Sequence, residues 1–139
     1  MTAPAIVRLE LPEPPSANRW WRMGRSGPRG GHSHMHLSAE ARAYKQVVQI
    51  KAGSAVRPIT AQREWPVYAR SVPVSVSIYW MRSRRAGDLD KRVGVLLDGL
   101  QGILFATDAQ VVVLHAERAE AKDGVGSVLV IVAPAVGIP

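Results

Sequence analysis

The chain has 139 residues, with 18 Lys and Arg against 11 Asp and Glu, which gives a formal net charge of +7. Its 47% hydrophobic content excludes a disordered chain, and the lack of cysteine excludes a disulfide scaffold and a thiolate metal site. No apolar run approaches the roughly 20 residues of a membrane span, and the N-terminus lacks the apolar stretch of a signal peptide. We therefore expect a cytoplasmic protein with a single domain over residues 1–139 and no membrane partner.

The basic residues gather in two places. No acidic residue lies between Glu13 and Glu40, and this gap contains Arg19, Arg22, Arg25, Arg29, His32, His34 and His36. A second cluster precedes every aspartate of the chain and consists of Arg82, Arg84 and Arg85. Basic clusters attract phosphates, whereas aspartates in the same site repel them unless a divalent cation lies between. The pattern fits either a metal-dependent nucleic-acid binder or a basic surface with ordinary solvated carboxylates.

The first half of the chain predicts a strand, a loop and a helix. Residues 5–11 alternate weakly and end at Pro12, which is typical of a first strand. Glycine and arginine dominate residues 22–31, so we expect a loop there. The histidines that follow alternate, and in an extended segment they would share one face. Ser38 is a good N-cap for a helix over residues 39–56.

The next segment predicts a loop, a strand and a second helix. Prolines favour a loop over residues 57–68, and strict alternation predicts a strand over residues 72–80. Asp88 is expected to cap the helix that follows, and Gly102 to stop it. The apolar face of this helix consists of Val93, Leu96, Leu97 and Leu100.

The last part of the chain predicts two strands, over residues 111–121 and 127–133. They flank Asp123 and Gly124, which indicates a hairpin. The expected fold is α+β or mixed α/β, a single small sheet of about four strands with two flanking helices.

Three aspartates are candidate metal ligands. Asp88 and Asp90 lie two residues apart at a helix start, where they either cap the first turn or converge on one hard cation. Because a helix of about 14 residues is roughly 20 Å long, Asp108 must fold back to join them, or the third carboxylate comes from another subunit. We expect Asp98 to be solvated or paired with Lys91.

Aromatic and imidazole side chains accompany the arginines of the first basic cluster. Trp20 and Trp21 either stack on bases, or one of them fills the core while the other is exposed. The spacing of His32, His34 and His36 suits a transition metal, but four nearby arginines favour a DNA-facing surface.

Five sequence blocks follow one another along most of the chain. They are 14–22 (PPSANRWWR), 38–44 (SAEARAY), 88–90 (DLD), 96–100 (LLDGL) and 108–112 (DAQVV). In that order they resemble the PPSxNRxxR, SxExxxY, DLDN, LLDAL and DDAQV motifs of the RusA-type endodeoxyribonucleases, the Holliday junction resolvases of bacteria and their phages. The resemblance implies a homodimer that resolves four-way DNA junctions with Mg²⁺ by paired symmetric nicks, in recombination, repair or phage DNA processing.

The same resemblance assigns roles to individual residues. It implies that Asp88, Asp90 and Asp108 are the catalytic aspartates that hold Mg²⁺. We further expect Lys91, with a catalytic role, and Arg92 to contact the scissile strand. The junction arms would be held by Asn18, Arg19, Arg22, Arg84 and Arg85.

Three positions depart from the family pattern. The asparagine of DLDN is Lys91, the lysine three residues further on is Gly94, and the first Asp of DDAQ is Thr107. Either Lys91 substitutes for the absent lysine, or the chain binds junctions without cutting them. A third hypothesis is a general nucleic-acid-binding basic protein whose aspartates only cap a helix.

Overall fold

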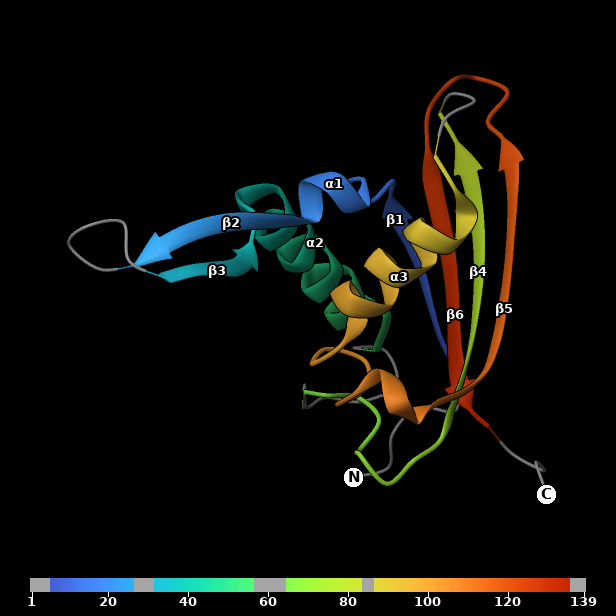
Figure 1. The fold of residues 1–139 in the computed structure, drawn as a ribbon. Helices are drawn as coiled ribbons and strands as arrows, with labels where there is room; N and C mark the ends of the chain where they lie inside the picture. The colour runs from blue at the N-terminus through green and yellow to red at the C-terminus, as the bar shows by residue number, and fades with distance from the viewer. Residues whose placement is uncertain (1–5, 27–31, 57–64, 84–86, 136–139) are drawn as a thin grey trace.

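The computed structural model describes residues 6–26, 32–56, 65–83 and 87–135 (Figure 1). Its elements in chain order are β1 (Val7–Pro12), α1 (Ala17–Trp20), β2 (Trp21–Ser26), β3 (His32–Leu37), α2 (Ala39–Val56), β4 (Val74–Arg82), α3 (Leu89–Leu100), the short 3₁₀ helix η1 (Asp108–Gln110), β5 (Val111–Glu120) and β6 (Ser127–Pro134). In the described ranges, no helix is long and apolar enough to cross a membrane.

A mixed four-stranded sheet forms the centre of the fold, in the order β1-β6-β4-β5. Strand β6 runs antiparallel to β1 and β4, whereas β4 and β5 are parallel. The α+β class and the four-stranded sheet are confirmed. The predicted hairpin of the last two strands is wrong, because β4 lies between β5 and β6. The alternating side chains of β4 are buried on one face, whereas most of those of β5 are exposed, so β4 takes the interior position and β5 the edge.

Helices α2 and α3 lie on the same side of the four-stranded sheet (Figure 1). The core between them and the sheet contains the alternating residues Val74, Val76, Ile78 and Trp80 of β4, all nearly inaccessible to solvent. Burial of one such side chain contributes about 1.5–3 kcal/mol, so this layer provides the main apolar stabilisation of the sheet.

The two longer helices match their predicted positions. Helix α2 has the predicted bounds, and its Ala41 N–H donates to the Ser38 hydroxyl at 3.0 Å, which confirms the N-cap. Helix α3 begins directly after Asp88, although the Asp88 side chain makes no capping hydrogen bond. Gly102 adopts φ +84°, a left-handed conformation that suits the residue after a helix end, so the predicted stop is confirmed.

Strands β2 and β3 form a separate two-stranded antiparallel sheet, the β2–β3 ribbon. The loop predicted from residue 22 onward is therefore wrong over the part that belongs to β2, and residues 27–31 lie outside the described ranges. The glycine and arginine content hid a short alternation in which Trp21 and Met23 point to one face and Arg22 to the other. In Figure 1 the ribbon extends away from the helices and the four-stranded sheet.

Candidate functional site

Two adjoining pockets lie between α3 and α1. The larger, of about 330 Å³, is lined by Ala17, Trp20, Trp21, Lys91, Gly94, Val95, Asp98 and Asp108. The smaller, of about 220 Å³, lies at the start of the helix and is lined by Ser16, Ala17, Asn18, Gly87, Asp88, Lys91 and Arg92. Lys91 and Ala17 line both, so the two pockets form one groove that carries both acidic and basic groups.

The three predicted metal ligands do not gather within this chain. Asp88 and Asp90 lie at the N-terminal end of α3, both exposed. The Asp108 N–H donates to the Gln101 side-chain oxygen at 3.0 Å, which places Asp108 beyond the other end of the helix. A helix of 12 residues is about 18 Å long. Among the described residues, no three Asp, Glu or His side chains stand together as a metal site.

The donor chemistry nevertheless suits a hard cation. Carboxylate oxygens are the ligands that Mg²⁺ and Ca²⁺ prefer, but only the Asp88 and Asp90 carboxylates share one end of α3. One chain by itself therefore does not fit a three-carboxylate site. Asp108 therefore does not fold back to the start of its own α3, which was one of the two alternatives for it.

Lys91 lies where both pockets meet. Its Nζ is 3.7 Å from Asp88 Oδ2, and both side chains are exposed. An exposed ion pair of this kind contributes at most about 1 kcal/mol, so the ammonium group can turn toward a phosphate at little cost. Of the two alternatives for Asp98, the pair with Lys91 is wrong, because Lys91 pairs with Asp88.

Asp98 instead accepts a hydrogen bond from Trp20. The indole Nε1 lies 2.5 Å from Asp98 Oδ2, and the Trp20 ring is 1% exposed. Trp21 is 43% exposed and lines the larger pocket. The two tryptophans thus divide as one of the alternatives predicted, with Trp20 in the core and Trp21 at the surface. A half-buried Asp98 is explained by the indole N–H, which needs an acceptor once the ring is buried.

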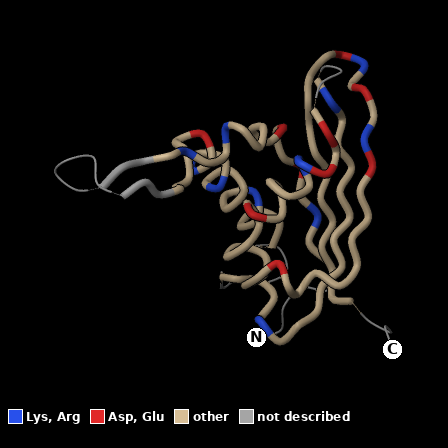
Figure 2. Tube along the Cα trace, in the orientation of Figure 1, with Lys and Arg blue, Asp and Glu red and all other residues tan. Residues whose placement is uncertain are grey.

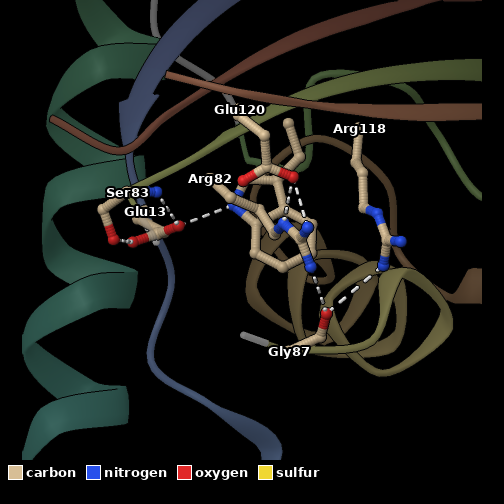
Figure 3. A network of polar contacts seen from close by, with 7 residues as sticks. Glu13, Arg82, Ser83, Gly87, Arg118 and Glu120 are labelled. Atoms are coloured by element: carbon tan, nitrogen blue, oxygen red, sulfur yellow. Dashed lines mark hydrogen bonds and ion pairs between the residues drawn. The ribbon is translucent and has the colours of Figure 1, made fainter. Parts of the chain in front are cut away.

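The start of α3 is held by a polar network that the sequence did not predict (Figure 3). Glu13 accepts hydrogen bonds from Trp80 Nε1 at 2.7 Å, from the Ser83 hydroxyl at 2.7 Å and from the Ser83 N–H at 3.2 Å. The Arg92 guanidinium lies 5.1 Å from the centre of the Trp80 ring and donates to the Pro14 carbonyl. These contacts tie the turn after β1, the end of β4 and the first turns of α3 together.

Glu13 is kept ionised by its surroundings. Burial alone would raise the pKa of the Glu13 carboxyl. The hydrogen bonds from Ser83 and Trp80 and the Arg92 charge together outweigh burial, and they hold the pKa below its usual value of 4.5. The network therefore contains a charged acceptor at neutral pH.

Gly87, the residue before Asp88, is held in place by side chains from two strands, β4 and β5. Its carbonyl accepts from Arg82 Nη1 at 3.3 Å and from Arg118 Nη1 at 3.4 Å, and Arg82 also forms an ion pair with Glu120 (Figure 3). Gly87 has φ +97°, and a Cβ on it would lie 3.1 Å from the Trp80 ring. The position requires glycine, and the two arginines set the direction in which the chain enters α3.

The predicted DNA-binding residues lie in three different settings. Asn18 and Arg19 of α1 and Arg22 of β2 are exposed, and Asn18 lines the pocket that contains Asp88. Arg92 is half-buried, and its contacts with the Trp80 ring and the Pro14 carbonyl brace the fold. Arg84 and Arg85 lie outside the described residues.

The histidines of the first basic cluster lie in β3, which confirms their extended backbone. His36 is exposed, and its Nδ1 lies 3.1 Å from the Leu37 carbonyl. The side chains of His32 and His34 lie outside the described part of the structure. At the end of β5, far from these histidines in the sequence, acidic and basic residues follow one another (Figure 2).

The sequence of this chain matches a known protein family over the segment that contains the groove. The profile of the family described as Endodeoxyribonuclease RusA matches residues 12–132. The chain belongs to the RusA endodeoxyribonuclease family. The match runs from the end of β1 into β6 and includes both pockets and the network around Glu13. This match confirms the resemblance carried by the five sequence blocks. The family is one of endonucleases that resolve Holliday junctions. No curated protein sequence matches the chain.

Proposed function

We propose that this protein is a divalent-metal-dependent endonuclease that resolves four-way DNA junctions by paired symmetric nicks. The observation that carries the proposal is the RusA family match over residues 12–132. The groove along α3 supports it, because exposed carboxylates, a lysine and an asparagine line one open surface. Junction DNA would lie across this groove, with Asn18, Arg19 and Arg22 on its phosphates.

The proposed chemistry takes place at the start of α3. Asp88, Asp90 and Asp108 would hold Mg²⁺, which when bound polarises a phosphate and lowers the pKa of a water. Lys91 lies beside Asp88, where its ammonium group can contact the scissile strand. The side chain of Asn18 lines the same pocket and can orient the sugar-phosphate backbone by hydrogen bonds.

A second copy of the chain would bring Asp108 to the start of α3. Strand β5 is an edge strand, and its residues Val112, Val113 and Leu114 are exposed on both faces. Apolar edge strands are normally covered, and two copies can pair antiparallel through such an edge around a two-fold axis. Asp108 precedes the start of β5, whereas Gly87 contacts Arg118 near its end. Antiparallel pairing would therefore bring Asp108 of one copy toward Asp88 of the other.

The first experiment is a nicking assay on a labelled, immobile four-way junction with and without Mg²⁺. Asp90→Asn should abolish nicking and leave junction binding intact, because the arginines remain. Asp123→Asn is the matched control, since Asp123 lies in the exposed connection before β6. Symmetric nicking that persists in Asp90→Asn contradicts the assignment.

Mixing two inactive variants tests the shared site. Asp90→Asn and Asp108→Asn should each be inactive alone, but a mixed dimer restores one complete set of aspartates when Asp108 acts across the interface. The expected result is nicking of one strand by the mixture. If Asp108 acted within its own chain, every site in the mixture would lack one carboxylate and no activity would return.

Gly94 supports a second candidate function, that of a junction binder with impaired cleavage. Gly94 stands at the position of the family lysine and lines the larger pocket without a side chain. Gly94 is exposed, and a Cβ at this position would meet nothing within 4 Å, so a side chain can start there without a clash. Tight junction binding with no nicking by the natural chain, together with nicking by Gly94→Lys, would establish this function. Nicking by the natural chain shows that another group, with Lys91 the nearest, replaces the lysine.

A further inference from the structure

The β2–β3 ribbon has an apolar face and a basic face. Cross-strand pairing sets Trp21 opposite Leu37, Arg22 opposite His36 and Met23 opposite Met35. Because side chains alternate along a strand, the tryptophan, the leucine and the two methionines share one face. The pair of Arg22 and His36 occupies the other face.

The apolar face is open to solvent over most of its length. Met23 is 68% exposed, Met35 56% and Trp21 43%, while Leu37 packs against the core. Ile50 of α2, by contrast, is an exposed apolar side chain that stands singly and needs no partner. A row of three on one face of a projecting ribbon is a contiguous apolar surface, which in soluble proteins marks a binding site.

Charge indicates that the partner is an anion. The sequence from residue 14 to residue 39 contains four arginines and no acidic residue. An acidic protein partner would satisfy the arginines, but it would need an apolar patch of its own to match the methionines and the tryptophan. Nucleic acid offers both, since its phosphates pair with arginine and its bases stack against apolar side chains.

The apolar face is continuous with the groove along α3. Trp21, at the base of the ribbon, also lines the pocket that contains Lys91 and Asp108. A nucleic acid lying on this face of the ribbon therefore passes directly into the groove. The ribbon and the groove can hold one substrate at two points.

We propose that Met23 and Met35 form a wedge that inserts against the open base-pair ends at the crossover point of a four-way junction. Trp21 stacks beside them, and Arg22 contacts a flanking phosphate from the other face. Unbranched methionine side chains suit this role, because apolar wedges of this kind enter base steps and adapt to their shape. The inference rests on the proposed function for its substrate and adds how the protein recognises the centre of that substrate.

The test uses the full chain and junctions that carry 2-aminopurine either at the crossover point or within one arm. Binding of the natural protein should raise the fluorescence at the crossover point, where insertion unstacks the base, and leave the arm position unchanged. Met23→Ala with Met35→Ala should remove that rise and weaken junction binding about tenfold, with duplex binding unchanged. Ile50→Ala is the matched control, because Ile50 is equally exposed, at 68%, but lies on α2.

Each contrary result has a distinct meaning. An unchanged fluorescence rise in the double variant overturns the wedge, and junction nicking by that variant would leave the proposed function standing. Equal weakening of junction and duplex binding also overturns the wedge, since it indicates a ribbon that lies in a groove of any duplex. If the natural protein shows no preference for junctions over duplex, the proposed function and the wedge both fail.

Discussion

The start of α3 and the β2–β3 ribbon lie on either side of the same groove, but they are built in opposite ways. Around Gly87 and Trp80, hydrogen bonds from charged side chains of four segments hold the turn that leads into α3. Along the ribbon, Met23 and Met35 are left exposed and contact mainly each other's strand. The first region holds carboxylates in a fixed geometry, and the second offers a surface that conforms to a partner. Changes to the first should cost stability, and changes to the second should cost binding alone.

Gly87→Ala should produce the largest effect on stability. A left-handed conformation costs a residue with a Cβ about 1–2 kcal/mol, and the Cβ would also press on the Trp80 ring at 3.1 Å. We expect a loss of about 2–3 kcal/mol in the free energy of unfolding by urea denaturation, together with reduced nicking.

Gly124→Ala is the matched control for that substitution. Gly124 also has a positive φ, +74°, but a Cβ there would meet nothing within 4 Å. It should show the conformational cost alone and leave nicking unchanged. Equal losses in the two variants would show that the contact with Trp80 contributes nothing.

Glu13→Ala should produce the next largest effect. It removes the acceptor for the Trp80 indole and for both donors of Ser83, and an unpaired buried donor costs about 1–3 kcal/mol. We expect a loss of about 1–2 kcal/mol in thermal or urea unfolding. Glu13→Gln keeps an acceptor and should lose less. Similar losses in both variants would assign the stabilisation to charge.

The same carboxylate predicts a pH dependence. Because the folded protein lowers the pKa of Glu13 below 4.5, its contribution to stability is fully present above that pH and is lost as the pH falls through the lower folded value. Stability curves from pH 6 to pH 3 should therefore fall less steeply for Glu13→Gln than for the natural chain. Parallel curves would contradict the assignment.

Met23→Ala with Met35→Ala should have the smallest effect on stability. Exposed positions away from buried contacts change the unfolding free energy by less than about 0.5 kcal/mol. The same variant should lose junction affinity, as argued above, so stability and binding separate in one protein. A stability loss above 1 kcal/mol would show that the ribbon supports the fold.

Sequence patterns located the elements with strong local signals. Ser38 and the helix after it, the alternation in β4 and the glycine that ends α3 are all carried by neighbouring residues, so their positions were predicted to within a few residues. The order of the strands was not predicted from the sequence. Whether β4 or β6 lies beside β5 depends on which strand buries more surface. The ribbon was missed because glycine and arginine obscured a short alternation.

The candidate site divides along the same line. Asp88, Asp90 and Lys91 are adjacent in the sequence, and the motif located them together. The separation of Asp108 from that group depends on the length and direction of α3, which a motif does not record. Glu13 had no local signal, because its donors come from residues about 70 positions further along the chain.

Strand β6 has a consequence for the order in which the protein can be made. It follows every other element in the sequence, yet it lies between β1 and β4 and pairs with both. Before residue 127 has been synthesised, β6 does not exist. Strand β1 then has no partner, and one edge of β4 is unpaired. The sheet therefore closes only after synthesis has passed residue 134, and pairing between segments this far apart slows folding. During translation, the apolar side chains of β1 and β4 depend on the helices or on chaperones for cover.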